Sequence, residues 1–204
     1  MSKFLISFCL LFLIKSSSAQ LSIRAFNYRP TGDYGFALKP ANSIEIGYME
    51  LYDDDKTFSK RFRSNISITY IKMNPRMDSI PIFEVISSNG YILYPGTEII
   101  KKWNEFRLFM GLDFAFIKRK RFFVYSGIDA AVGIISCEII NNLSVDGNIN
   151  SRGIAGLRFR LGFEYKITDN IHIFATANRQ IALLLGPPGS MSANDYGLGI
   201  CLEF

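Results

Sequence analysis

The chain ends with the stretch 196–204, which reads Tyr-Gly-Leu-Gly-Ile-Cys-Leu-Glu-Phe. Successive side chains of an extended strand point to opposite faces, so this stretch has one apolar face and one face of small or polar residues. The apolar face consists of Tyr196, Leu198, Ile200, Leu202 and Phe204. A soluble edge strand would alternate in the same way. The fold therefore depends on whether the rest of the chain contains similar strands and begins with an export signal.

Residues 1–19 have the pattern of a cleaved secretory signal peptide. Lys3 provides the positive start, and 4–14 is an unbroken apolar run. Small residues follow at the position where signal peptidase cleaves, ending in Ala19. The apolar run is too short to cross a bilayer as a helix, which takes about 20 apolar residues. We therefore expect a signal peptide at 1–19 and one exported domain at 20–204.

Seven further segments have the alternation of strands, and no long segment has the helical period. They are 21–28, 42–52, 61–73, 105–117, 122–137, 153–167 and 171–184. The clearest is 105–117, in which every second residue from 106 to 116 is large and apolar. The faces of the first and the seventh strand are ambiguous. Together with 196–204, these segments predict eight strands.

The connections between the strands alternate in length. Short turns fall near Asp53, Lys118 and Thr168, and longer loops near Thr31, Asn74, Asn141 and Gly186. Transmembrane barrels combine short periplasmic turns with longer extracellular loops, and their even strand number returns both termini to the periplasm. The sequence therefore predicts an all-β fold: an eight-stranded antiparallel up-and-down transmembrane β-barrel with short periplasmic turns and longer extracellular loops.

A soluble, lipocalin-like barrel is the competing architecture, and it would place the apolar faces inside. Its interior would have to hold six large apolar residues from the strand 105–117 alone, while Arg158 and Arg160 would face water. The apolar faces are too wide and too aromatic to fill one small interior. The alternation therefore favours the membrane barrel.

The signal peptide, the eight strands and the closing stretch that ends in Phe204 resemble a small outer-membrane β-barrel protein. The resemblance implies that the apolar face of 196–204 is the signal shown to the barrel assembly machinery. The richness in Lys, Ile, Asn and Phe is similar to that of the porin-like barrels of Bacteroidota. It implies the outer membrane of a Gram-negative bacterium, contact with outer-membrane lipid and, for some such barrels, a role as an accessory of the type IX secretion system.

The polar faces of the strands carry charges of both signs at similar depth. The predicted lumen charge network comprises Glu45, Arg63, Glu105, Arg107, Asp113, Asp129, Arg158, Arg160, Glu164 and Glu203. These charges could form a proton or ion path, or they could form a salt-bridged plug. The interior of an eight-stranded barrel is only wide enough for side chains to fill, which favours the plug.

The longest connection, 74–103, contains its own hairpin signal, Asn89-Gly90, between two β-rich runs. Pro81 and Pro95 bracket this hairpin and discourage its pairing into the barrel wall. Because the connection is far longer than needed, we expect it to bind a partner. The candidate contact residues are Ile80, Ile82, Phe83, Asn89, Gly90, Ile92 and Leu93.

Two further surface features are expected at the membrane boundaries. The candidates for an interfacial aromatic girdle are Tyr70, Tyr91, Tyr94, Trp103 and Tyr196. The charge run 118–121, Lys-Arg-Lys-Arg, would be a solvated turn that could hold lipid headgroups or a periplasmic partner.

No constellation of residues predicts catalysis, a metal or a cofactor. His172 is the single histidine, and no cysteine pair has zinc spacing. The net charge of +5 is mild and no basic patch with interleaved aromatic residues predicts nucleic-acid binding. His172 follows the short turn near Thr168, so we expect a rim residue at the periplasmic end, whereas outer-membrane lipid hydrolases and acyltransferases use a histidine near the outer leaflet.

Three functions remain open. The first is a non-enzymatic outer-membrane barrel that binds an envelope or secretion-system protein through its loops or rim. The alternative is an outer-membrane lipid-modifying enzyme. The third is a soluble periplasmic binding barrel of the lipocalin type.

Overall fold

The computed structural model describes residues 19–32, 35–50, 61–76, 80–87, 91–141, 148–185 and 190–203. The strands in this part of the chain are β1 (Ala19–Thr31), β2 (Ala41–Glu50), β3 (Phe62–Met73), β4 (Ile80–Ser87), β5 (Tyr91–Lys118), β6 (Phe122–Asn141), β7 (Asn148–Lys166), β8 (Ile171–Leu185) and β9 (Ser192–Glu203). Among the same residues, no helix is long and apolar enough to cross a membrane.

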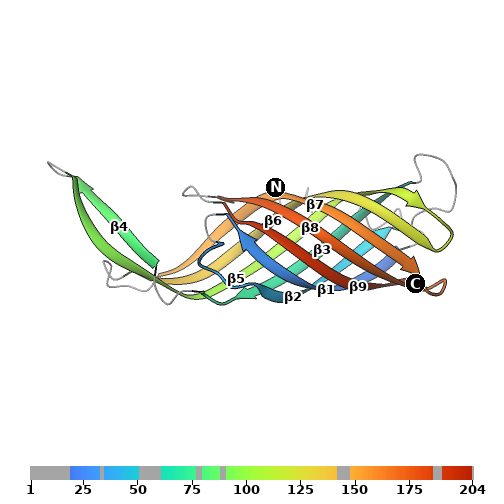
Figure 1. The fold of residues 1–204 in the computed structure, drawn as a ribbon, viewed down its shortest axis with the longest axis horizontal. Coiled ribbons are helices and arrows are strands. Elements are labelled where there is room, and N and C mark those ends of the chain that lie inside the picture. Colours follow the sequence, from blue (N-terminus) through green and yellow to red (C-terminus); the bar gives the residue numbers. More distant parts are fainter. Residues whose placement is uncertain are drawn as a thin grey trace, which may run out of the picture.

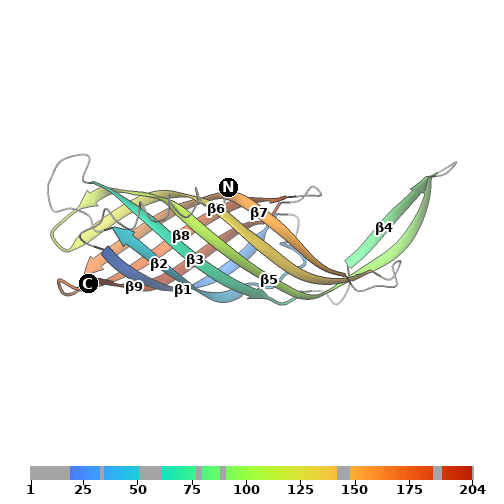
Figure 2. The same ribbon diagram turned by 180° about the vertical axis from the view of Figure 1, so that it is seen from behind.

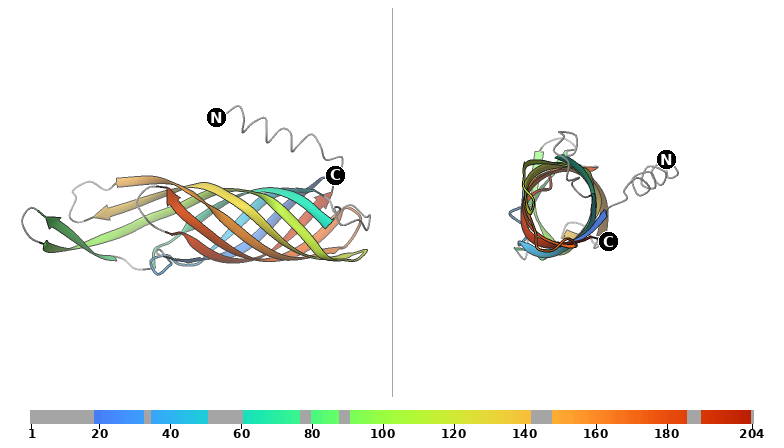
Figure 3. Two further views of the ribbon diagram at one scale, coloured as in Figure 1. Left: turned by 90° about the horizontal axis from the view of Figure 1, so that it is seen from above. Right: turned by 90° about the vertical axis from the view of Figure 1, so that its right-hand side faces the viewer.

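The strands form one antiparallel sheet that closes on itself. Its order is β3-β2-β1-β9-β8-β7-β6-β5-β4, and β3 also pairs with β5. This extra pairing closes eight strands into a barrel and leaves β4 outside the wall, as Figure 1 and the view along the barrel in Figure 3 show. The predicted eight-stranded antiparallel barrel is confirmed.

Alternation along the strands gives the barrel an apolar outside and a polar inside. On β7, Leu161 is 54% exposed while its neighbour Arg160 is 7% exposed. The same contrast recurs on β5 between Leu112 and Asp113. A soluble barrel has the opposite polarity, because its apolar residues must be buried away from water. The observed polarity suits a barrel surrounded by lipid. It rules out the arrangement of a soluble, lipocalin-like barrel, in which the apolar residues face the interior.

Two faces that the sequence left ambiguous are resolved by the structure. On β1, Leu21 and Ile23 face outward and Arg24 faces inward. On β8, Ile173 faces outward and Phe174 is buried in the lumen.

One end of the barrel carries the short turns and both ends of the described chain. The turn between β5 and β6 is closed by the Arg119 amide, which donates to the Phe122 carbonyl at 2.8 Å. The turn between β7 and β8 comprises residues 167–170. Gln20 of β1 pairs with Glu203 of β9 at this end, which is the periplasmic end by the rule of short turns. The turn predicted near Asp53 lies outside the described residues.

The 74–103 connection differs from its prediction. The run 91–94 and the predicted strand 105–117 are parts of one continuous strand, β5, which has 28 residues and includes Pro95. β4 pairs only with the first part of β5, from Ile80↔Glu98 to Ser87↔Tyr91, and β6 begins its pairing with β5 at Glu98. The two-stranded segment of 80–87 with 91–97, called here the projecting hairpin, therefore extends past the outer end of the wall (Figures 1 and 2).

The register explains why Pro95 does not interrupt β5. Pro81 pairs with Thr97 and Pro95 pairs with Phe83, so both prolines lie in rows of the same parity. Alternate rows of an antiparallel ladder form no hydrogen bonds between the two strands, and a proline, which has no N–H, fits only such a row. The missing donors of Pro81 and Pro95 then lie on the two free edges of the projecting hairpin.

Candidate functional site: the charged lumen

The structure brings nine of the ten predicted lumen charges together inside the barrel. All nine are buried: Glu45, Arg63, Glu105, Arg107, Asp113, Asp129, Arg158, Arg160 and Glu164. The tenth, Glu203, lies at the periplasmic end of β9, is partly exposed, and forms no ion pair with any described residue. The lumen network also includes two charges that the sequence analysis did not name, Arg24 and Asp195.

The centre of the network is Asp129 of β6. Its carboxylate accepts from Arg158 Nε and from Arg160 Nη2, each at 2.5 Å. Arg158 also donates to Glu45, on the opposite wall of the barrel. Arg160 Nε lies 3.5 Å from Asp113 Oδ1, which extends the network to β5. Buried charges of opposite sign in this arrangement compensate one another's loss of hydration.

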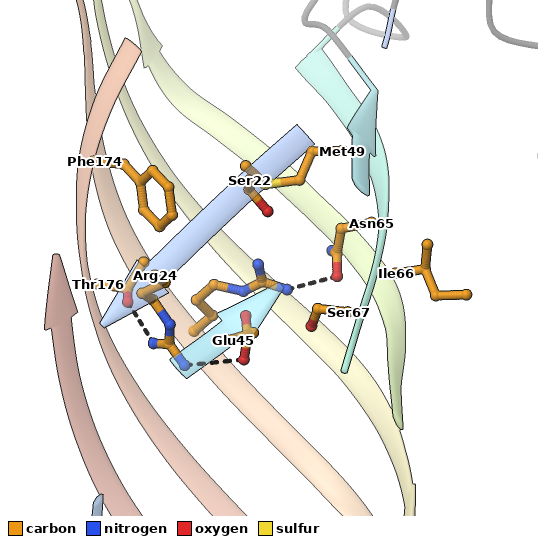
Figure 4. A pocket seen from close by; sticks show the side chains of 10 residues that line it. Ser22, Arg24, Glu45, Met49, Asn65, Ile66, Ser67, Phe174 and Thr176 are labelled. Atoms are coloured by element: carbon orange, nitrogen blue, oxygen red, sulfur yellow. Dashed lines mark hydrogen bonds and ion pairs between the residues drawn. The ribbon is translucent and has the colours of Figure 1, made fainter. Parts of the chain in front are cut away.

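Arg24 joins β1 to its neighbours on both sides. Its guanidinium donates to Glu45 Oε2 at 3.1 Å, to Thr176 Oγ1 at 2.6 Å and to Asp195 Oδ1 at 2.8 Å. Figure 4 shows Arg24 between Thr176 and Glu45, with both interactions drawn as dashed lines. Asp195 also accepts from Asn178 and Gln180, each at 2.7 Å. All its partners are thus lumen side chains of β1 and β8.

At the periplasmic end the network reaches His172. Arg63 bridges Asp113, at 3.0 Å, and Glu164, at 2.6 Å. Glu164 Oε1 lies 2.6 Å from His172 Nδ1, and Gln20 Nε2 is 3.2 Å from the same nitrogen. His172 is therefore at the periplasmic end, as expected, but it is a buried lumen residue and not a rim residue. The expectation was wrong because the alternation of β8 turns His172 inward beside Glu164.

At the outer end the network closes around Glu105. Arg107 donates to Glu105 at 2.5 Å, to the Tyr28 hydroxyl at 2.7 Å and to Gln180 at 2.5 Å. Trp103 Nε1 donates to Glu105 Oε1 at 2.9 Å. Trp103 is buried, so its assignment to the aromatic girdle is wrong. Its parity with Glu105 and Arg107 on the continuous strand β5 makes it a lumen residue.

Inward-facing aromatic rings cover the arginines of the network. The Arg158 guanidinium carbon lies 3.7 Å from the centroid of Phe109, and that of Arg63 lies 4.5 Å from the centroid of Tyr125. Arg24 lies over Phe26 and Arg107 over Tyr28 in the same way. A guanidinium on an aromatic face is stabilised by the ring quadrupole, the more so where water is excluded. The rings therefore add attraction as well as bulk to the packing of the lumen.

Glycines opposite the large side chains make this packing feasible. Gly162 pairs across β6 and β7 with Tyr125, and a Cβ atom at Gly162 would lie 2.1 Å from the Tyr125 ring. Gly199 pairs with Phe174, and a Cβ there would lie 2.3 Å from that ring. Gly162 and Gly199 therefore leave the space that the rings of Tyr125 and Phe174 occupy.

The middle of the lumen is filled. Figure 4 shows side chains that line a cavity in the lumen, among them Ser22, Asn65, Ser67 and Phe174. The cavity has a volume of about 10 Å³. This is about the space that one water molecule needs. With ion pairs joining opposite walls, such an interior can hold the barrel rigid, but it leaves no room at this depth for a hydrated ion.

The remaining predicted surface residues lie in three places. Tyr70 and Tyr196 are exposed on the outer wall, as a girdle requires. Tyr91 and Tyr94 lie on β5 within the projecting hairpin. Tyr196, Leu198 and Ile200 of the predicted assembly signal face outward on β9, and Leu202 is partly exposed. Phe204 lies outside the described residues.

The candidate contact residues of the 74–103 connection lie partly on β4, partly on β5 and partly outside the described residues. β4 contains Ile80, Ile82 and Phe83, and β5 contains Ile92 and Leu93. Asn89 and Gly90 lie outside the described residues, as do 1–18 of the predicted signal peptide. Cys137 and Cys201 are free and buried on β6 and β9.

Two of the lumen charges could have been found in the sequence. Arg24 alternates with Leu21, Ile23 and Ala25, so a firm facing for β1 would have placed it inside. Asp195 lies one residue before the predicted start of the last strand at 196. The alternation Asp195, Gly197, Gly199 continues the lumen face of β9 upward, which is the signal that was missed.

No protein-family model matches the chain, and no curated protein does so either. Two solved outer-membrane proteins have a similar fold. Ail, the attachment invasion locus protein of Yersinia pestis in complex with the heparin analogue sucrose octasulfate, aligns with a TM-score of 0.54 and 16% identity over 93% of this chain and 99% of Ail. Neisserial surface protein A aligns with a TM-score of 0.56 and 11% identity over 93% of this chain and 100% of that protein. With its apolar exterior and charged lumen, the chain is thus an eight-stranded barrel of the kind that spans the outer membrane of Gram-negative bacteria.

Proposed function

We propose that the protein is a non-enzymatic component of the cell envelope that binds a partner protein through the projecting hairpin. The observation that carries the proposal is the contrast between a lumen closed by ion pairs and the projecting hairpin. Among the described residues, β4 pairs only with β5, and residues 91–97 of β5 pair only with β4. A filled lumen leaves loops and rims as the places for specific recognition. The longest of these is the hairpin.

The names of the similar proteins support this assignment at the level of its class. Ail is named as an attachment and invasion protein and the neisserial protein as a surface protein. The finer form of the proposal is an accessory of a secretion system. Its support is the composition, rich in Lys, Ile, Asn and Phe, which is similar to that of the porin-like barrels of Bacteroidota, a group in which some barrels have that role.

The test replaces residues 80–97 by a short Gly-Ser turn, which keeps every pairing of β5 with β6. We expect the variant to insert and to show heat-modifiable gel mobility like the full chain, but to lose the envelope protein that cross-links to the wild type in cells. The matched control changes Arg119 and Lys120 to Gln at the opposite end and should keep the partner. If the hairpin variant retains the cross-link and the control loses it, the binding site is the periplasmic turn.

The closed lumen has its own test. Purified protein in planar bilayers should show no stable ion conductance, because the ion pairs Arg158–Glu45 and Arg63–Glu164 cross the lumen between strands that are not neighbours. A steady open channel would contradict the plug and favour an ion path.

The alternative, a lipid-modifying enzyme, finds less support in the geometry. His172 is buried in the lumen near the periplasmic end, where its Nδ1 contacts both Glu164 and Gln20. A lipid ester bond in the outer leaflet would be at the opposite end of the barrel. Unchanged lipid A and phospholipid composition in a deletion strain is the expected result, and loss of a lipid modification would favour the enzyme.

A further inference from the structure

Two arginines face outward on the barrel wall beside one asparagine. Arg29 of β1 and Arg179 of β8 both pair with Asn194, on the strand β9 that lies between them. Both arginine side chains are exposed. The three residues therefore form one polar cluster across three neighbouring strands.

The contacts of this cluster are neutral. Arg29 Nε donates to Asn27 Oδ1 at 2.9 Å, and Arg179 Nη1 donates to Thr31 Oγ1 at 3.1 Å and to Asn194 Oδ1 at 3.0 Å. Within the described part of the chain, neither arginine forms an ion pair with a carboxylate. The five lumen arginines differ, since each has a carboxylate partner. The exterior thus carries two adjacent positive charges without a negative partner in these residues.

On β1 and β9 the cluster lies at the outer end of the apolar surface. On β1, the outward residues Ile23 and Ala25 lie below Asn27 and Arg29, and on β9, Leu198 lies below Tyr196 and Asn194. On β8, apolar residues continue above Arg179, beginning with Ile181. Arg179 is therefore bordered by apolar surface, where an unpaired charge is costly unless it reaches an anionic headgroup.

Two grooves lie on the wall beside this cluster, and Tyr196 lines both of them. The first, of about 660 Å³, is lined by Ala25, Ser43, Ala175, Gly197 and Leu198 among others. The second, of about 350 Å³, includes Arg179 and Asn194 at one end and Leu161 and Ala177 below them. The first groove arises where three neighbouring strands carry small residues: Ala25 on β1, Ala175 on β8 and Gly197 on β9. Both grooves are open to the side that faces lipid.

We propose that this face binds a phosphorylated lipid of the outer leaflet. Its phosphate lies between Arg29 and Arg179, and its acyl chains occupy the grooves beside Tyr196. Guanidinium groups bind phosphate oxygens with charge-assisted hydrogen bonds, and an apolar groove directly below adds burial of the chains. Charge and groove together distinguish a lipid from a free anion, which would need the arginines alone.

The test measures binding of lipid A to the detergent-solubilised full-length protein by native mass spectrometry. Diphosphoryl lipid A is compared with the same lipid after removal of its phosphates, which leaves the acyl chains unchanged. We expect the phosphorylated form to bind at least tenfold more tightly. The double variant R29Q/R179Q should lose about thirtyfold in affinity for it, from the contribution of two basic residues near a membrane surface. The matched control K101Q/K102Q removes equal charge from exposed side chains on β5, away from the cluster, and should bind like the wild type.

A second variant tests the groove. Ala175→Phe fills the groove beside Tyr196 without changing the charge, and it should weaken lipid binding while the heat-modifiable mobility stays normal. Unchanged lipid affinity in both R29Q/R179Q and Ala175→Phe would overturn the proposal. Competition by millimolar inorganic phosphate, with no effect of Ala175→Phe, would also overturn it, because the site would then be a simple anion site.

Discussion

The lumen and the projecting hairpin are both built from antiparallel strands, but only the strands of the wall have a neighbour on each side. In the lumen, each arginine meets a carboxylate and ion pairs join opposite walls. In the hairpin, β4 has one neighbour, β5, and an open edge. Closure of the barrel brings the buried charges next to charges of opposite sign, which is why we propose that a partner binds outside the closed wall.

The largest effect is expected from breaking the centre of the lumen. Asp129→Ala would leave Arg158 and Arg160 without their shared carboxylate, and we expect a loss of about 3 to 5 kcal/mol in the free energy of unfolding. Urea unfolding in lipid vesicles measures this loss. Asp169→Ala, whose ion pair with Lys166 is at the surface with Asp169 96% exposed, is the control and should have little effect. Equal losses in the two variants would contradict a network in which burial matters.

A charge placed on the outer face of the wall should lower the free energy of unfolding nearly as much. Leu161→Arg places a charge near the middle of the apolar belt on β7, and it should destabilise the barrel by about 2 to 4 kcal/mol. Phe36→Arg is the matched control, since Phe36 is exposed in the loop after β1 and not in the wall. The measurement is urea unfolding in vesicles, followed by heat-modifiable mobility. If Leu161→Arg folds as stably as the wild type, the wall does not face lipid at this position.

A smaller effect is expected from filling one lumen space. Gly162→Ala places a methyl group within 2.1 Å of the Tyr125 ring, so the ring must move. We expect a loss of about 1 to 3 kcal/mol, typical of overpacking. The cost should largely disappear when the same change is made in a Tyr125→Leu background, as measured in a double-mutant cycle. A cost that is independent of Tyr125 would show that the ring does not need the space of Gly162.

The smallest effect on stability is expected in the hairpin. Pro81→Val should change the free energy of unfolding by about 0.5 kcal/mol or less. It adds an N–H group to the free edge of β4, so self-association should increase. Thr97→Val changes the paired residue in the same row without adding a donor, and it should leave the protein monomeric in cross-linking and light-scattering measurements. Equal association of both variants would refute the assignment of Pro81 to a protected edge.

Alternation predicted much of the lumen but not its pairing. Glu45 and Arg158 could be placed on inward faces from their own strands, because side-chain direction in a strand has a period of two residues. Their contact across the barrel could not, since Glu45 is on β2 and Arg158 on β7, and only closure and register bring them together. Trp103 was assigned to the girdle for a different reason: the predicted strand began at 105, so the inward parity that Trp103 shares with Glu105 was missed.

The sequence by itself determined the number of barrel strands, the face of most residues and the end of the barrel at which the short turns lie. These depend on local patterns, namely alternation, turn residues and apolar length. The tertiary structure decided which charge meets which, that His172 is enclosed beside Glu164, that β5 continues through Pro95, and that Arg29 and Arg179 lie together on β1 and β8. Such contacts join residues far apart in the chain, and only the register of a closed sheet fixes them.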